Sequence, residues 1–156
     1  MTLSVKDHLI KLIATGLYSS SVPPWPGTTG TIPAWLIAFF LIRGNQMWLG
    51  LASVVCFFVS VAVATAAERF MGHDSRYIVI DEWIGMFIAV LFVPWSLTNY
   101  LLAFVAFRLL DAIKVPPAAQ LEALPRGWGV TMDDVIAGLQ ANVVVQIFLL
   151  LRSLLS

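Results

Sequence analysis

Long runs without a charged residue dominate the chain and predict helices embedded in a membrane. Asp, Glu, Lys and Arg are absent from residues 12–42, 44–67, 83–107 and 135–151. A helix that spans a bilayer needs about 20 mostly apolar residues, or about 17 at the shortest. Residues 47–67 meet this length, and residues 135–151 just reach it. These two segments are the clearest predicted spans.

Turn signals divide the remaining apolar sequence into shorter arms. The turn-forming group at residues 94–99 splits the third run into two helices that meet at a hairpin. Residues 29–42 form a shorter arm that ends at the turn 43–46. Alternating apolar and polar faces over residues 1–18 predict an amphipathic helix lying in the membrane interface. The expected fold class is all-α: a polytopic membrane bundle of about five membrane-embedded helices plus this N-terminal helix.

Composition supports a single membrane domain over residues 1–156. Hydrophobic residues make up 60% and charged residues 12% of the chain, which argues against a soluble protein. Nine basic and nine acidic residues cancel, so nucleic acid is excluded as a partner. The one cysteine, Cys56, excludes an intrachain disulfide and a cysteine-based zinc site. Within the domain, residues 19–31 are a candidate phosphate-binding loop, and residues 32–151 contain the membrane helices.

The distribution of basic residues predicts the orientation. Most of the polar chemistry lies at one membrane face, in residues 19–30, 68–80 and 111–131. That face carries seven of the nine Lys and Arg residues, whereas only Arg43 and Arg152 lie at the other. By the positive-inside rule, the polar face is cytoplasmic.

Five acidic residues are expected to meet near this face. Asp81 and Glu82 begin one predicted helix, Asp111 ends the next, and Asp133 and Asp134 begin the last. A rise of ~1.5 Å per residue from the hairpin places Asp81 and Asp111 at a common depth. Helix N-capping is the structural alternative, but it explains only one acid per helix. Ionisable residues at membrane depth are costly, so their convergence favours a function.

A divalent cation would relieve the repulsion among these acids. Oxygen ligands without cysteine favour Mg²⁺ or Mn²⁺ over zinc or copper. Gly85 follows Asp81 by four residues, and Gly138 follows Asp134 by four. Each carboxylate therefore shares a helix face with a glycine, at which a neighbouring helix can approach closely.

Two further segments are candidates for binding an anion. The stretch from Pro26 to Thr31 contains Gly27, Thr28 and Gly30 and leads into the first membrane arm. Its backbone N–H groups and hydroxyls are typical of a phosphate cradle, although a proline-glycine turn explains the same residues. The second candidate consists of Arg108, Asp111 and Lys114. These residues recur every three positions, along one side of the end of a predicted helix. An Arg108–Asp111 ion pair with a solvated Lys114 is its structural alternative.

Taken together, four segments resemble the bacterial phosphatidylglycerophosphatase A family. They are residues 26–31, 80–85, 107–114 and 132–138, in the order and spacing of that family. Asp74 also stands where the family carries an aspartate. Two departures are Thr31, where the family usually has serine, and Val115, where it usually has proline.

The resemblance implies a Mg²⁺-dependent membrane enzyme of phospholipid biosynthesis. Such an enzyme hydrolyses the terminal phosphomonoester of phosphatidylglycerophosphate to phosphatidylglycerol and phosphate, at the cytoplasmic face of a bacterial inner membrane. One or two Mg²⁺ ions, or Mn²⁺, are expected at Asp81, Glu82, Asp133 and Asp134. The expected phosphate-binding residues are Gly27, Thr28, Gly30, Arg108 and Lys114. Asp74 or Asp111 is the expected general acid or base. Direct attack by water is favoured, because the sequence has no Cys-x5-Arg segment and no D-x-D pair, and a covalent aspartyl intermediate is the alternative. Beyond the lipid substrate and the bilayer, no protein partner is indicated.

Two other functions compete with this interpretation. A Mg²⁺-dependent lipid phosphoalcohol transferase also clusters aspartates at the cytoplasmic edge, but its D-G-x2-A-R through G-x3-D-x3-D pattern is absent. A non-catalytic membrane subunit or ion-coupled transporter would use the carboxylates as a cation site. Transporters usually place such groups near the midplane on broken helices, whereas here they lie at predicted helix ends.

Overall fold

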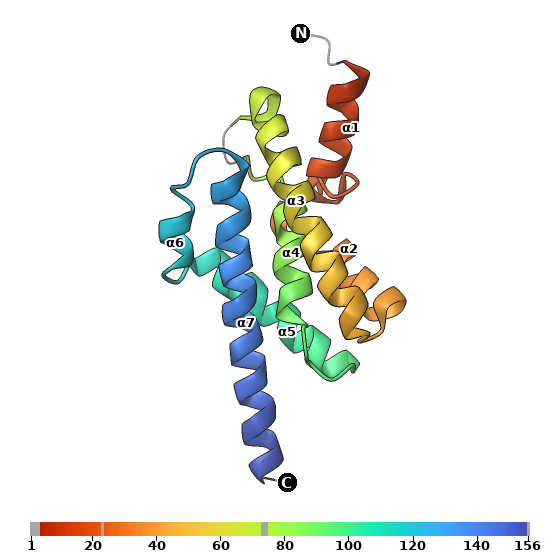
Figure 1. Ribbon diagram of the computed structural model, residues 1–156, viewed down its shortest axis with the longest axis vertical. Helices are drawn as coiled ribbons and strands as arrows, with labels where there is room; N and C mark the ends of the chain where they lie inside the picture. Colours follow the sequence, from red (N-terminus) through yellow and green to blue (C-terminus); the bar gives the residue numbers. More distant parts are fainter. Residues whose placement is uncertain (1–3, 23, 73–74, 156) are drawn as a thin grey trace.

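The computed structural model describes residues 4–22, 24–72 and 75–155, and these residues form helices and turns without a strand (Figure 1). The helices are α1 (Val5–Ala14), η1 (Ser19–Ser21), α2 (Pro26–Leu36), η2 (Ile37–Ile42), α3 (Gln46–Met71), α4 (Ile80–Ala89), α5 (Leu97–Ile113), α6 (Ala118–Leu121) and α7 (Gly127–Leu155). The two chain ends lie at opposite ends of the molecule. The predicted all-α fold is therefore confirmed.

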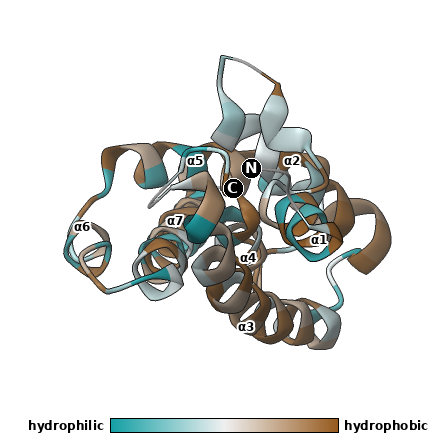
Figure 2. Ribbon diagram, turned by 90° about the horizontal axis from the view of Figure 1, so that it is seen from above, coloured by the Kyte–Doolittle hydropathy of each residue, from teal (hydrophilic) through white to brown (hydrophobic). Residues whose placement is uncertain are grey.

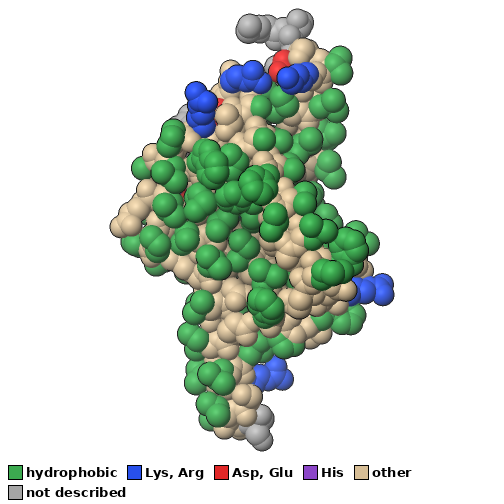
Figure 3. Space-filling model, viewed as in Figure 1, with side chains coloured by type: hydrophobic (Ala, Val, Ile, Leu, Met, Phe, Trp, Pro, Cys, Tyr) green, Lys and Arg blue, Asp and Glu red, His purple; other side chains and the backbone are tan. Residues whose placement is uncertain are grey.

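Helices α3 and α7 are the two described helices long and apolar enough to cross a membrane. They contain 26 and 29 residues, respectively. Large apolar side chains are exposed along both. In Figure 2 the ribbon of α3 is coloured largely hydrophobic, and in Figure 3 hydrophobic side chains cover much of the face in view. Helix α4 has 10 residues, which corresponds to about 15 Å and is shorter than a bilayer core. The two strongest predicted spans are therefore candidate membrane-spanning helices, and the five-helix membrane topology stays a prediction.

Three helix boundaries differ from the sequence prediction. Helix α2 begins at Pro26, so half of the predicted loop at residues 19–31 is helical; proline is favoured in the first turn, where its missing N–H costs nothing. Helix α7 begins at Gly127, six residues before Asp133, because its first turn lies against α3 and the Gly127 N–H donates to Thr65 Oγ1 at 3.1 Å. Helix α1 ends at Ala14, since the three residues from 16 to 18 have positive φ.

The orientation of α1 bears on the predicted interfacial helix. Ser4 and Asp7 form a reciprocal capping box at its start. In Figure 1, α1 stands beside the end of α3, roughly along the long axis of the molecule. Val5 and Leu9 are exposed on it. Its placement in the membrane interface stays a prediction.

Helix α4 is the central element of the fold, and nine of its ten residues are buried. It crosses α7 where two glycines meet. A Cβ atom added to Gly138 would lie 2.5 Å from the Gly85 carbonyl oxygen, and one added to Gly85 would lie 2.8 Å from the Asp134 carbonyl oxygen. The two backbones are thus in direct contact, as the paired glycines predict. Because Asp81 and Asp134 each lie one turn before the crossing, the contact brings their helix turns together.

The end of α4 inside the protein is capped by a side chain from α7. Asn142 Nδ2 donates to the carbonyl oxygens of Ile88, Ala89 and Leu91 at 3.1, 3.2 and 2.6 Å. The helix does not continue past Ala89 to supply its usual donors, although the Ile88 carbonyl also accepts from the Leu91 N–H at 3.1 Å. Leaving carbonyl groups unpaired in an apolar interior is costly. Asn142 therefore lets α4 end away from water.

Replacing Asn142 with Leu is expected to destabilise the protein by about 1–3 kcal/mol, the usual cost of leaving buried acceptors unpaired. Thermal unfolding in detergent, followed by circular dichroism, measures the change. The control is Val143→Leu, which alters an exposed apolar side chain on the same helix and is expected to leave the unfolding temperature unchanged. Equal unfolding temperatures for both variants would contradict the capping role.

Candidate functional site

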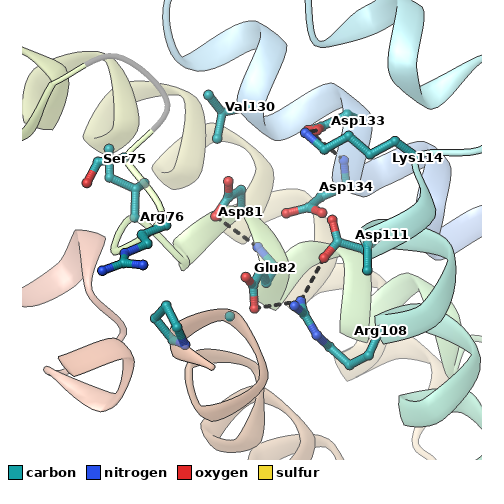
Figure 4. A pocket seen from close by; sticks show the side chains of 14 residues that line it. Ser75, Arg76, Asp81, Glu82, Arg108, Asp111, Lys114, Val130, Asp133 and Asp134 are labelled. Carbon is teal, nitrogen blue, oxygen red and sulfur yellow. Dashed lines mark hydrogen bonds and ion pairs between the residues drawn. The ribbon is translucent and has the colours of Figure 1, made fainter. Parts of the chain in front are cut away.

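A cavity of about 290 Å³ lies where α2, α4, α5 and α7 approach the segment that precedes α4 (Figure 4). The charged residues that line it are Arg76, Asp81, Glu82, Arg108, Asp111, Lys114, Asp133 and Asp134. All five acids expected to meet therefore lie around one cavity. Acids outnumber bases there, so the cavity is suited to a cation together with an anionic ligand.

The acids of α4 and α7 are the most buried charged groups of the cavity. The exposed fractions of Asp81, Glu82, Asp133 and Asp134 are 4, 8, 6 and 3%. In each pair the first aspartate accepts a hydrogen bond from the backbone N–H of the next residue. The Glu82 N–H donates to Asp81 Oδ1 at 3.1 Å, and the Asp134 N–H donates to Asp133 Oδ1 at 3.0 Å. Asp134 Oδ1 is buried and has no hydrogen-bond partner among the described residues. Because buried carboxylate oxygens are rarely left unpaired, Asp134 is a candidate ligand for an absent group.

Arg108 links two of the acids across the cavity. Its Nη1 lies 2.9 Å from Glu82 Oε2 and 2.8 Å from Asp111 Oδ2. The Thr31 hydroxyl, from α2, donates to the same Glu82 oxygen. The Arg108–Asp111 ion pair expected as the structural alternative is thus present, and it forms part of a larger network that includes Glu82. Held at two points, the guanidinium keeps a fixed orientation toward the cavity.

Lys114 does not extend into solvent as its structural alternative predicted. It caps α5, and its Nζ lies 3.0 Å from Asp133 Oδ2 and 2.6 Å from Glu122 Oε1. Partial burial by itself disfavours the ammonium, but these hydrogen bonds outweigh it and raise the pKa of Lys114 above its usual value. Lys114 is therefore a permanent cation beside the α7 acids. Glu122 was not predicted, since nothing in its sequence surroundings distinguishes it.

The donor atoms of the cavity fit a hard divalent cation. Asp81, Glu82, Asp133 and Asp134 offer only oxygen ligands, and no described residue is hydrogen-bonded to Asp134 Oδ1. Within the part of the chain that the structure describes, no three Asp, Glu, His or Cys side chains already stand together as a ligand cluster. Mg²⁺ commonly binds through one or two carboxylates and keeps several waters, so a preformed cluster is not required.

The predicted phosphate loop contributes less to the cavity than expected. Gly27 lines it, and a Cβ atom there would lie 2.5 Å from Arg108 Nη2 and 2.6 Å from Glu82 Oε1. Gly30 instead packs against Val79: a Cβ atom added to Gly30 would lie only 2.6 Å from the Val79 Cβ atom. Thr28 is half-buried on α2 but is not one of the described lining residues. The structure therefore brings Gly27 to the acids and leaves Thr28 and Gly30 outside. Asp74 lies outside the described residues.

Two lining residues were not predicted from the sequence. Ser75 and Arg76 precede α4 and lie on the opposite side of the cavity from Arg108 (Figure 4). Their position beside the acids depends on the path of the segment between α3 and α4. The only sequence signal for them is their proximity to Asp81.

Comparison with known proteins identifies similar chains. The family model described as phosphatidylglycerophosphatase A matches residues 12–149. Proteins named phosphatidylglycerophosphatase A from Haemophilus influenzae and Escherichia coli are 33% and 35% identical, covering 87% and 81% of this chain and 86% and 76% of their own. A Bacteroides thetaiotaomicron protein, provisionally named phosphatidylinositol-3-phosphatase, is 34% identical over 87% of this chain and 91% of its own. No solved structure matches significantly.

Proposed function

Because this chain belongs to the phosphatidylglycerophosphatase A family, we propose that the cavity lined by its five acids is where the terminal phosphate of phosphatidylglycerophosphate is removed. The chain is a phosphatase of phosphatidylglycerol synthesis. The observation that carries the proposed location is the convergence of buried carboxylates with Arg108 and Lys114 around one cavity. A transporter or scaffold would not need two cations among its cation-binding acids.

The substrate explains why the site lies in a membrane protein. A diacyl lipid keeps its chains in the bilayer, so its terminal phosphate reaches a protein at the level of the headgroups. The two long apolar helices α3 and α7 are consistent with a membrane protein. The proposal places the chain in the inner membrane as a multi-pass protein with its cavity facing the cytoplasm, on the distribution of Lys and Arg.

In the proposed mechanism, Arg108 and Lys114 bind the phosphate oxygens. Both are cations held in place by carboxylates, so little of their freedom is lost when the substrate binds. Asp111 orients the Arg108 guanidinium through its 2.8 Å contact. Gly27 leaves room beside them, because any side chain at that position would overlap Arg108 and Glu82.

The enzyme is proposed to depend on magnesium held by the acids of α4 and α7. Asp81, Glu82, Asp133 and Asp134 would bind one or two Mg²⁺ ions, which supply positive charge to the phosphate and increase the acidity of a bound water. Water is the proposed nucleophile. Asp111, partly exposed at the cavity, is the proposed general base among the described residues. The water oxygen forms a bond to phosphorus as the bond from phosphorus to the glycerol oxygen breaks, and that oxygen receives the proton that Asp111 took from the water.

Purified protein in mixed micelles is expected to release phosphate from phosphatidylglycerophosphate in Mg²⁺ and to lose activity at least about a hundredfold in EDTA, because the metal supplies much of the charge stabilisation. Added Mg²⁺ should restore the rate. Full activity in EDTA would remove magnesium from the proposal. Faster release from phosphatidylinositol 3-phosphate, the substrate in the name of the Bacteroides relative, would overturn the proposed substrate.

A further inference from the structure

Arg76 differs from the other cations of the cavity. Arg108 and Lys114 are each joined to two carboxylates. Arg76 is exposed, and among the described residues it forms no ion pair with an acid. Its Nη2 donates to the Tyr77 hydroxyl at 3.0 Å, and its guanidinium lies 5.0 Å from the Tyr77 ring centroid. The charge of Arg76 is therefore available to a ligand at the cavity.

The segment that carries Arg76 is held at several points. The Ile78 N–H donates to the Ser75 carbonyl at 2.7 Å, which closes a turn around Arg76. The Tyr77 carbonyl accepts from Ser20 Oγ at 2.8 Å, and the Val79 N–H donates to the Ala14 carbonyl at 2.8 Å. These bonds tie the segment to the residues around η1 and to the end of α1. Arg76 thus stands on a backbone whose position is fixed beside the cavity.

The substrate carries two phosphates with different requirements. The terminal phosphomonoester has to reach the acids and Arg108, where its bond to glycerol is broken. The phosphodiester, which joins glycerol to the lipid, stays intact and lies nearer to the lipid chains. Arg76 lies across the cavity from Arg108, with its guanidinium directed away from the acids, so a substrate that spans the cavity would meet it at the cavity rim (Figure 4). A planar guanidinium is suited to pair with the two free oxygens of a phosphodiester.

We propose that Arg76, assisted by the Ser75 hydroxyl, binds the phosphodiester of the lipid while the terminal phosphate lies at the acids. This inference rests on the proposed function. Arg76 is then a specificity-determining residue: it selects lipids in which a phosphomonoester is separated from the diacylglycerol by a phosphodiester and a polyol. A lipid with one phosphate attached directly to diacylglycerol cannot contact both ends of the cavity.

The test is the Arg76→Gln variant assayed in mixed micelles of fixed lipid fraction. For phosphatidylglycerophosphate, KM is expected to rise about tenfold with kcat within about twofold, the effect of losing one charge-assisted hydrogen bond made equally in ground and transition states. The inhibition constant of phosphatidylglycerol, which has the phosphodiester alone, should rise by the same factor. The inhibition constant of inorganic phosphate, which occupies only the other end, should not change.

Two further variants make the result specific. Arg76→Lys keeps the positive charge but loses the two parallel N–H donors of the guanidinium, so its KM should lie between those of wild type and Arg76→Gln. Arg69→Gln removes an arginine that lines a different cavity and is expected to match wild type. Unchanged KM and phosphatidylglycerol inhibition in Arg76→Gln would overturn the role of Arg76, as would an equal change in inhibition by phosphate. A wild-type protein without phosphatase activity would overturn the proposed function itself, and with it this inference.

Discussion

Replacing Asp134 with Asn is expected to lower kcat for phosphatidylglycerophosphate by about a thousandfold or more, a loss typical of removing a group that acts in the transition state. Asp134 is 3% exposed, and its Oδ1 has no hydrogen-bond partner in the part of the chain that the structure describes. The amide has nearly the same shape as the carboxylate, so the α4–α7 contact is preserved. What is lost is a negative charge and a ligand for a cation. Steady-state phosphate release, with unfolding temperature measured in parallel, provides the test.

A matched control removes a carboxylate elsewhere. Asp7 lies on α1, is partly exposed, and among the described residues forms its hydrogen bonds with Ser4 at the start of its own helix. Asp7→Asn is expected to retain wild-type kcat. An Asp134→Asn protein that is folded and turns over within tenfold of wild type would remove Asp134 from the reaction. Loss of activity together with loss of folding would instead assign it a structural role.

Replacing Gly138 with Ala is expected to destabilise the protein by about 2 kcal/mol or more and to reduce activity at the same time. The new Cβ atom would lie 2.5 Å from the Gly85 carbonyl oxygen and 2.9 Å from its Cα. Both contacts are with backbone, which cannot rotate away as a side chain can, so α4 and α7 have to separate. Because Asp81 and Asp134 lie one turn away, their spacing changes with the separation. Thermal unfolding and phosphate release are measured on the same preparation.

Gly50 offers the control for this substitution. It lies within α3, and a Cβ atom there would meet no heavy atom within 4 Å. Gly50→Ala is expected to be neutral or to stabilise the protein by up to about 1 kcal/mol, as alanine usually does inside a helix. If Gly138→Ala and Gly50→Ala unfold at the same temperature, the close α4–α7 contact is wrong.

Sequence reasoning reached the convergence of the acids because membrane helices restrict geometry strongly. The number of residues between the hairpin and each aspartate, multiplied by the helix rise per residue, gives the membrane depth of Asp81 and of Asp111. The positions of Gly85 and Gly138 then indicate which helix faces meet. Both expectations depend on regular periodicity and on apolar length, which a single sequence displays directly. The chemical roles of these residues stay predictions.

The remaining features depend on tertiary contacts that no local pattern encodes. The bond from Thr31 to Glu82 joins α2 to α4, and the contact of Lys114 with Glu122 depends on the short helix α6. The extra turns of α7 before Asp133 are stabilised by packing against α3. Arg76 reaches the cavity only because its segment is tied to residues near the N-terminus. Spacing within one element carries no information about such partners.

The assembly of the cavity from distant segments also constrains how the protein is made. A chain is synthesised from its N-terminus, so Asp81 and Glu82 leave the ribosome before Arg108, and Arg108 before Lys114. Burying unpaired carboxylates in lipid is costly. We therefore expect the newly made α4 to remain at the aqueous edge of the membrane until α5, which carries Arg108, has been synthesised. Insertion of this helix is then a late event in biogenesis, coupled to the translation of sequence that follows it.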